Sequence, residues 1–537
     1  MQLIEITLAL LLAVAAVAAL GKWVSAPLPV LLVAGGVALS FLPGFRSLKI
    51  APDIFFLLFI PPLLFADAWL IPKRDLLKVI RPVLLLAFGL VFLTVLVIGY
   101  LMRWLIPDLP LAAAFALGAV ISPTDAVAVR SITARLAIPS RVSTIIDGES
   151  LINDASGLIA FKFAVAAALT GAFSWDRAIM EFFLSSGGGF VLGVAVAWSI
   201  GQLRVGLRRF CVDDPTIQTV ISLLTPYAAY LAAEALGVGG ILAVVGAGLY
   251  AGAHDLRNLE PATRAHAWEV WRMVLFAFNG IVFVLLGVQL HSIIAGLTRA
   301  GALQFAGYAL ALSGAVIALR IVWVFPAAYL PLFLSRRIRE REGIHNPRAV
   351  FLTGWAGIRG SVTMAAALSI PFAAAGGAPF PGRDLIILLA ASVIVVTLLV
   401  NGMALPFVIR TLGIHGDRIA EREERAARIA TAQAAIEALR RRLPSLKTAE
   451  ESAFATSLLG GYEQRVQRYS ANAERRTRLD AQHASQRSIW LAALAAERAE
   501  LMQMRETDII NDEVLRRLQV DLDLEETRIS GATRDAG

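Results

Sequence analysis

The residues best suited to chemistry lie in one short stretch of an otherwise apolar region. Residues 147–162 read DGESLINDASGLIAFK, which contains Asp147, Glu149, Asn153, Asp154 and Lys162. Charged groups are costly in hydrocarbon, so such residues on a membrane helix indicate a functional site. On a helix, Ser150, Asn153 and Asp154 would share one polar face.

Asp154 and Asn153 are the predicted centre of the site. Burial disfavours the charged form of a carboxylate, so near neutral pH such a group can hold either a proton or a hard cation, but not both. The alternative is a structural polar pair that caps a helix break. We favour the ion- and proton-binding interpretation.

A second anomaly, Ser122-Pro123-Thr124-Asp125, interrupts another apolar stretch about 25 residues upstream. Proline removes a backbone hydrogen bond and breaks or kinks a helix. Unwinding frees the carbonyl and hydroxyl oxygens of Thr124, which suit a small monovalent cation, and Asp125 can neutralise the facing positive helix end. The alternative is a simple proline kink.

Arg359 and Glu149 are the third predicted feature. Arg359 lies in an apolar span and needs a carboxylate partner, and Glu149 is the best candidate. If they pair, both stay charged, so we expect a structural ion pair that supports the site.

Other charged residues within apolar spans have weaker signals. Asp67 follows Pro-Pro-Leu-Leu-Phe and is interpreted either as a gate or second ligand or as a boundary carboxylate that reaches water. Lys162, Arg320 and Glu234 are expected to be structural partners or side chains that extend to the interface.

Composition indicates a polytopic membrane protein. Of 537 residues, 57% are hydrophobic and 17% charged. The excess of positive charge lies in residues 1–412, which hold 29 Lys/Arg and 20 Asp/Glu, whereas residues 413–537 hold 20 and 21. It reflects basic loops rather than a nucleic-acid surface. One cysteine excludes an internal disulfide, and no phosphate-binding glycine loop or zinc-ligand spacing is present, so no cofactor is expected.

Thirteen apolar spans can be distinguished: 4–20, 26–42, 52–70, 82–102, 110–129, 142–171, 182–203, 215–235, 238–253, 273–290, 302–334, 349–375 and 384–412. The first is interpreted as a spanning helix rather than a cleaved signal, because its leading segment carries Glu5 and no Lys or Arg. Connections after odd-numbered spans hold 19 Lys and Arg and those after even-numbered spans hold six, which predicts an external N-terminus and a cytoplasmic C-terminus.

The fifth and twelfth spans are the two that are interrupted, the latter by Gly354, Gly357, Arg359, Gly360 and Ser361. Interruptions seven spans apart are typical of an inverted repeat with a site at its interface. We therefore predict an all-α polytopic fold of about 13 transmembrane helices, with inverted repeats and two broken, crossing helices.

The composition changes after Leu412, so we divide the chain into a transmembrane domain, 1–412, and a charged cytoplasmic tail, 413–537. The tail reads as helices over 418–443, 465–500 and 513–528, broken at Pro444 and at Gly460-Gly461. A solvated helical appendage is favoured over a dedicated sensor.

Four segments resemble the monovalent cation–proton antiporter family, which contains bacterial sodium/proton antiporters and animal sodium/proton exchangers. They are ISPTDAVAV, GESLINDASG, PYAAYLAAEALGVGGILAVV and GWAGIRGSVTMAAALS, within about residues 1–412. The resemblance implies 13 spans, a homodimer in the bacterial plasma membrane, and electroneutral exchange of one sodium ion for one proton.

By motif position, the resemblance assigns roles to the site residues. Asp154 is similar to the essential ion-binding carboxylate, Ser150 to a side-chain ligand, and Thr124 to a ligand through its backbone carbonyl. Asn153 and the Glu149–Arg359 pair resemble supports of the helix break.

The sequence departs from the family pattern at one place. Many bacterial relatives carry a glutamate directly after Pro-Pro-Leu-Leu-Phe, where this chain has Ala66 followed by Asp67. Either Asp67 substitutes for it, or the ion has one carboxylate fewer.

Two alternatives to a sodium/proton antiporter stay open. One is a potassium or mixed monovalent cation/proton exchanger. The other is an intramembrane aspartyl protease using Asp125 and Asp154, although a Gly-rich context around the second aspartate is missing.

Overall fold

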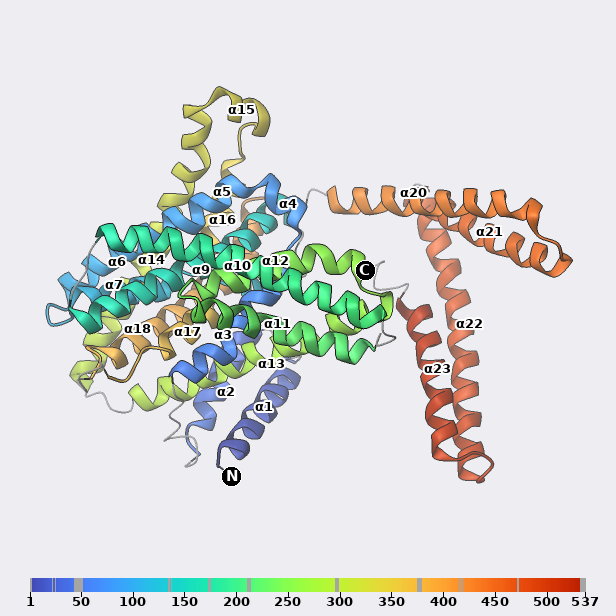
Figure 1. Cartoon of the computed structure of the whole chain (residues 1–537), viewed down its shortest axis with the longest axis horizontal. Coiled ribbons are helices and arrows are strands. Elements are labelled where there is room, and N and C mark those ends of the chain that lie inside the picture. Colours follow the sequence, from blue (N-terminus) through green and yellow to red (C-terminus); the bar gives the residue numbers. More distant parts are fainter. Residues whose placement is uncertain are drawn as a thin grey trace. The chain divides into compact units, whose positions relative to one another are not determined.

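The computed structural model describes residues 2–21, 23–24, 26–42, 52–133, 136, 138–171, 175–209, 214–294, 299–373, 379–414, 416, 419–470 and 473–531. Its regular elements over these residues are all helices (Figure 1). The chain forms two compact units, Met1–Asp417 and Arg418–Gly537.

The helices of the first unit run in chain order as α1 (Gln2–Leu20), α2 (Leu28–Leu39), α3 (Pro52–Leu70), α4 (Lys73–Lys78), α5 (Ile80–Leu84), η2 (Leu85–Leu90), α6 (Val91–Leu105), α7 (Leu111–Ile121), α8 (Ala126–Thr133), α9 (Ser140–Thr170), α10 (Trp175–Arg209), α11 (Pro215–Ala235), α12 (Gly240–Asn258), α13 (Pro261–Ile294), α14 (Arg299–Leu334), α15 (Arg336–Glu342), α16 (Pro347–Trp355), α17 (Ser361–Leu368), α18 (Arg383–Val396), η3 (Thr397–Gly402) and α19 (Met403–Thr411).

Length and apolar composition make this unit a membrane protein. Among the described residues, seven helices are long and apolar enough to cross a membrane, and three shorter apolar helices accompany them. The predicted all-α polytopic class is confirmed. The thirteen crossings and the inverted repeat stay predictions.

Both predicted helix breaks are present. Helix α7 ends at Ile121 and α8 begins at Ala126, so 122–125 are unwound around Pro123, which lacks a backbone N–H. Helix α16 ends at Trp355 and α17 begins at Ser361, so 356–360 are unwound. Each break exposes helix ends and free backbone groups inside the unit.

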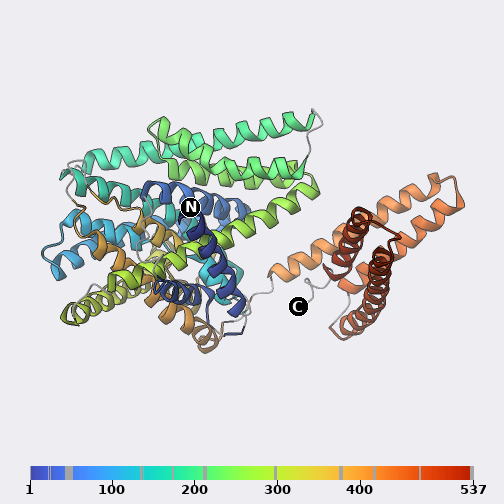
Figure 2. The ribbon, with the colours of Figure 1, turned by 90° about the horizontal axis from the view of Figure 1, so that it is seen from below.

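The helices of this unit pack in two groups. Helices α6, α7, α9, α14, α16 and α18 pack with one another, and α1, α2, α3, α10, α11, α12 and α13 form the second group. In Figure 2 the green helices α10, α11 and α12 lie side by side along one edge of the unit. Helix α17 contacts both groups, and α9 also reaches α3 and α12, so the broken segments lie where the groups meet.

The second unit is made of α20 (Ile419–Arg442), η4 (Leu443–Ser445), α21 (Ala449–Ser470), α22 (Ala473–Glu506) and α23 (Asp512–Gly531). Helix α20 pairs with α21, and α22 pairs with α23. Charged side chains join these helices, as in the Arg440–Glu463 and Arg498–Asp523 ion pairs at 2.8 and 2.5 Å.

The predicted break near Pro444 is present, but the one at Gly460-Gly461 is wrong. Helix α21 continues through both glycines. Glycine within a helix costs about 1 kcal/mol relative to alanine. We attribute the unbroken helix to its packing against α20, which offsets that cost.

Candidate ion-binding site

Helix α9 carries the central carboxylate. It runs for 31 residues to Thr170 and is capped by Gly171, whose φ of 68° is the left-handed conformation that favours glycine. Asp154, near its middle, is 2% exposed, and its Oδ1 atom accepts no hydrogen bond from the part of the chain that the structure describes. A buried carboxylate oxygen without a donor is suited to a proton or a cation.

That carboxylate faces a small cavity of about 20 Å³, lined by Leu63, Asp67, Pro123, Thr124, Asp125, Val127, Ser150, Asp154, Asn279, Gly360, Ser361, Val362 and Thr363. Such a volume holds about one water-sized guest. The cavity therefore brings together Asp67, the first break and the second break around Asp154.

Thr124, Ser150 and Asn153 tie the first break to α9. The Ser150 hydroxyl donates to the Thr124 carbonyl at 2.6 Å, and Asn153 Nδ2 donates to Thr124 Oγ1 at 2.8 Å. The Ala126 backbone N–H donates to Ser150 Oγ at 3.3 Å. These side chains line or border the cavity, and they also hold the unwound segment in place.

The Asp125 carboxylate lines the cavity and also accepts a hydrogen bond from the backbone. Its Oδ1 accepts the Ala128 backbone N–H at 3.0 Å, at the start of α8. A Cβ added at Gly360 would lie 1.7 Å from Asp125 Oδ2, so only glycine lets the second break come this close. Asp125 thus faces the N-terminal ends of α8 and α17, where partial positive charge gathers.

The two unwound segments bond to each other. The Asp125 backbone N–H donates to the Ile358 carbonyl at 2.7 Å, and Arg359 Nε donates to the Ile121 carbonyl at 3.1 Å. Arg359 Nη1 also donates to the Gly357 carbonyl at 2.7 Å. Arg359 therefore satisfies carbonyl groups that the breaks expose.

The predicted ion pair between Glu149 and Arg359 is wrong. Glu149, which is fully buried, pairs with Arg320 of α14: Arg320 Nη2 donates to Glu149 Oε2 at 2.7 Å, and Nη1 donates to Oε1. Arg320 Nε also donates to the Gly354 carbonyl at 3.0 Å. Its bidentate fork matches the carboxylate, whereas Arg359 is directed at backbone carbonyls.

Asp67, not Ala66, faces the cavity. Ala66 is completely buried in the apolar core, whereas Asp67 lines the same cavity as Asp154. The two positions are successive on α3, so they point about 100° apart around the helix axis.

Asn279 and Thr363 line the cavity but were not predicted as site residues from the sequence, and Ser361 was predicted only as part of the second break. Asn279 of α13 accepts the Ser361 hydroxyl at 2.6 Å, and Thr363 is buried with an Oγ1 atom that has no partner in the described residues. Asn279 was detectable as an amide inside the apolar span 273–290. The two hydroxyl residues gave no separate signal, because hydroxyls occur widely in membrane helices.

Lys162 and Glu234, expected to be structural partners, pair with each other. Lys162 Nζ lies 2.6 Å from Glu234 Oε1, and both side chains are just over 40% exposed. The ammonium also lies 5.7 and 5.6 Å from the ring centroids of Phe56 and Tyr230. This pair joins α9 to α11 of the other helix group, away from the cavity around Asp154.

Comparison with known proteins identifies relatives of this chain. Residues 8–411 match the family model described as "Sodium/hydrogen exchanger, transmembrane". The "Sodium, potassium, lithium and rubidium/H(+) antiporter" of Bacillus pumilus is 42% identical over 390 residues, which cover 71% of this chain and 57% of that protein. The match thus spans less than two thirds of that relative's length.

A second relative extends over nearly the whole chain. The "Uncharacterized Na(+)/H(+) exchanger YjcE" of Escherichia coli is 38% identical over 518 residues, 93% of each chain. Among solved structures, the sodium proton antiporter MjNhaP1 from Methanocaldococcus jannaschii has a TM-score of 0.58 at 19% identity, covering 74% of this chain and 98% of that one. The family resemblance read from the motifs is confirmed, and the structural likeness shows the fold.

Proposed function

Because the chain belongs to the sodium/hydrogen exchanger family, we propose that it is a secondary-active antiporter that exchanges a monovalent cation for a proton. Sodium is the first candidate, with lithium as a substitute. The cargo ions are its only small-molecule partners in this proposal, and it uses no resident cofactor and performs no covalent chemistry.

The observation that carries the proposal is the state of Asp154. It is 2% exposed, its Oδ1 has no donor within the described residues, and it faces a cavity sized for one small guest. A carboxylate in that position binds a proton or a cation, and binding one displaces the other. Occupancy by one ion at a time is the requirement for coupled exchange.

The neighbouring groups have supporting roles in this proposal. The Thr124 carbonyl and the Ser150 hydroxyl are ligands for the cation, and Asp67 supplies a second carboxylate at the cavity wall. Asn153 and Pro123 shape the break, and Asp125 stabilises the helix ends. Ser150 must turn its hydroxyl hydrogen away from the Thr124 carbonyl when both oxygens bind a cation.

Glu149 and Arg359 have structural roles as well. Glu149 is neutralised by Arg320, so it is removed from ion binding, and Arg359 satisfies carbonyls of both breaks. The protein alternates access to Asp154 by moving one helix group against the other, because the cavity lies where the groups meet.

The proposed topology has 13 crossings and an inverted repeat within residues 1–412. The N-terminus is external and residues 413–537 form a cytoplasmic tail, in keeping with the basic loops after odd-numbered spans. The protein would work in the bacterial plasma membrane as a homodimer, with no nucleic-acid partner.

A mixed monovalent cation/proton exchanger is the second candidate. It is favoured by the name of the Bacillus relative, which includes potassium and rubidium. In this candidate, Asp67 serves in place of the glutamate that the family resemblance puts at position 66, and its shorter side chain leaves more room for a larger ion.

The aspartyl protease alternative has less support. Such an enzyme needs two carboxylates that share a proton. Asp125 instead accepts a backbone N–H at a helix start and packs against Gly360.

Proton flux in proteoliposomes tests the proposal. Purified protein is reconstituted with an internal pH dye, and sodium, lithium, potassium and choline gradients are compared at several pH values. Cation-driven proton movement that needs Asp154 supports antiport, and the ratio of sodium to potassium responses selects between the two candidates. No cation-dependent flux under any gradient would reject antiport.

A further inference from the structure

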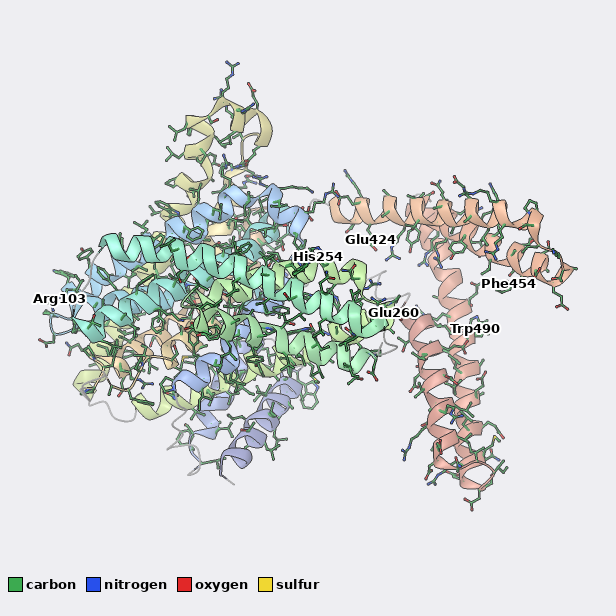
Figure 3. All side chains as sticks on the ribbon, viewed as in Figure 1. Arg103, His254, Glu260, Glu424, Phe454 and Trp490 are labelled. Atoms are coloured by element: carbon green, nitrogen blue, oxygen red, sulfur yellow. The ribbon has the colours of Figure 1, made fainter. Side chains whose placement is uncertain are left out.

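A second cavity lies at the basic ends of α10 and α12, away from Asp154. It measures about 50 Å³ and is lined by Phe65, Ala197, Ile200, Gly201, Gln202, Arg204, Val205, Arg208, Ser222, Thr225, Tyr250, Ala251, His254, Asp255, Asn258 and Leu259. Figure 3 labels His254 of α12, one of the lining residues, and its side chain is exposed. The cavity thus connects a buried interior to the surface.

Arg204 lies at the inner wall of this cavity, and one of its guanidinium nitrogens has no hydrogen-bond acceptor among the described residues. It is 7% exposed, Nε donates to Gln218 Oε1 at 2.9 Å, and Nη1 donates to Asp255 Oδ1 at 3.1 Å. Its Nη2 has no acceptor among the described residues, and neither has Nε2 of the fully buried Gln218. Buried donors without acceptors are costly, so the arrangement is suited to a guest that carries acceptors.

The charges of the groups around the cavity indicate that the guest is an anion. Asp255 is the one lining carboxylate, and its other oxygen already accepts Trp69 Nε1 at 3.1 Å. Arg208 also lines the cavity and donates to the Asn258 carbonyl. Lys73, whose ammonium donates to the Trp69 carbonyl at 2.6 Å, interacts electrostatically with the lining residue Asp255 and adds a third positive charge behind the wall.

The apolar part of the cavity wall indicates a second property of the guest, an attached hydrocarbon group. Ile200, Val205 and Leu259 form an apolar part of the lining next to the arginines. Charged donors beside an apolar wall at the end of membrane helices are suited to a phosphoryl group with hydrocarbon attached, as at anionic lipid headgroups.

We propose that this cavity binds a phosphoryl-bearing anion through Arg204 and Arg208. The guest would accept from Arg204 Nη2 and hold α10, α11 and α12 together, because Arg204, Gln218 and Asp255 come from these three helices. An anionic phospholipid headgroup and free phosphate share this chemistry. The site does not depend on cation exchange.

Binding is measured on the purified, delipidated full chain by native mass spectrometry and by the midpoint of thermal unfolding. The probes are phosphatidylglycerol, phosphatidylcholine with the same acyl chains, and potassium phosphate against potassium chloride at equal potassium. Arg208→Gln removes the outer cation. Arg204→Gln with Asp255→Asn removes the inner donor without leaving a buried unpaired charge. Arg272→Gln, at an exposed arginine of α13 that pairs with Glu269, is the matched control.

Phosphatidylglycerol should raise the midpoint of the wild type and of Arg272→Gln more than phosphatidylcholine does. Its affinity should fall by about tenfold or more in each cavity variant, since each loses a charge-assisted hydrogen bond. An equal response to inorganic phosphate identifies free phosphate as the ligand, and a response to the lipid alone identifies the headgroup. Equal binding by wild type and both cavity variants, or no response of the wild type to any probe, overturns the proposal.

Discussion

Three carboxylates in the broken-helix region have different surroundings. Glu149 forms an ion pair with Arg320, and Asp125 accepts a backbone N–H at a helix start. Asp154 has an oxygen with no partner in the described residues, and it faces the cavity. Environment rather than residue type therefore separates the candidate ion-binding group from its neighbours.

Asp154→Asn should abolish cation-driven proton flux in proteoliposomes while the protein stays folded. Asparagine has a similar shape but cannot exchange a proton, so neither half of the cycle can occur. Asp147→Asn is the matched control, because Asp147 lies on the same helix outside the cavity lining and faces Arg130 at 3.5 Å. The control should retain exchange. Full flux in Asp154→Asn would refute the assigned role.

His345 is a titratable residue of the connection between α14 and α16. Burial lowers the pKa of His345 from its usual 6.5; Arg141 and Arg81 act in the same direction, and Glu342 opposes them. Its Nε2 lies 3.6 Å from Glu342 Oε2, which also accepts from both arginines at 2.9 Å. A proton on His345 would add a third positive charge to this group.

Stability should therefore fall as pH is lowered through about 6.5, because the unfolded chain then binds more protons at this histidine than the folded chain does. Thermal unfolding midpoints in detergent between pH 8 and pH 5 measure the effect. His345→Gln should lose less stability than the wild type over that range. Parallel curves for the two proteins would contradict the expected titration.

At the scale of elements, the two breaks form one hydrogen-bonded crossing. The Asp125 N–H donates to the Ile358 carbonyl, and Arg359 donates to the Ile121 carbonyl, so each unwound segment satisfies a group of the other. Gly360 permits the close approach, because an added Cβ would overlap Asp125.

Gly360→Ala should lower the thermal midpoint and reduce exchange, since the two breaks must separate to admit the methyl group. Gly314→Ala is the matched control, because a Cβ at Gly314 of α14 meets nothing within 4 Å. Alanine is favoured over glycine in a helix by about 1 kcal/mol, so the control should be neutral or more stable. Equal midpoints for wild type and Gly360→Ala would show that the crossing is looser than described.

The Glu149–Arg320 pair holds α9, α14 and the second break together. Arg320→Gln leaves a buried carboxylate unpaired, which costs roughly 3–5 kcal/mol. Adding Glu149→Gln should recover part of that loss, measured as the unfolding midpoint. Adding Glu149→Gln to Arg359→Gln should recover less of the stability that Arg359→Gln by itself loses, because the structure shows no hydrogen bond between Glu149 and Arg359. Equal recovery in both double variants would favour the Glu149–Arg359 pairing instead.

At the scale of the whole molecule, the two helix groups meet around Asp154. Contacts between them include α17 with α3 and α13, and the Lys162–Glu234 ion pair between α9 and α11. Movement of one group against the other would change which side of the membrane reaches Asp154. Proton and cation would then share one carboxylate through the cycle.

Competition at that carboxylate has a measurable consequence. Below the pH at which Asp154 gains its proton, each unit of acidification should raise the half-saturating sodium concentration by up to about tenfold, with the maximal rate little changed. Fluorescence flux assays over two pH units measure this relation. A half-saturating sodium concentration that does not change with pH would require a second titrating group, with Asp67 or Lys162 as the first candidates.

The exchange of one sodium ion for one proton moves no net charge. A membrane potential imposed with valinomycin should therefore not drive transport.

The amino-acid sequence predicted the membrane class and both breaks, which the structure confirms, and it singled out Asp154, whose ion-binding role stays a prediction. These are local signals: an acid in an apolar run, a proline in a helix and a cluster of glycines can be recognised without knowing what packs against them. The motifs also indicated the family, because PTD and ESLxND lie at the two positions where chemistry is concentrated.

Which buried charges pair with each other could not be read from the sequence, because it depends on the packing of distant helices. Glu149 and Arg320 are 171 residues apart, and the sequence alone paired Glu149 with Arg359 and left Arg320 as a structural partner or a side chain that extends to the interface. The choice between them depends on which guanidinium the packed helices bring within hydrogen-bond distance of Glu149. Packing also sets the rotation of α3 about its axis, and this rotation turns Asp67 rather than Ala66 toward the cavity. Helix α21 continues through Gly460-Gly461 because contacts with α20 outweigh the local preference of glycine for a break.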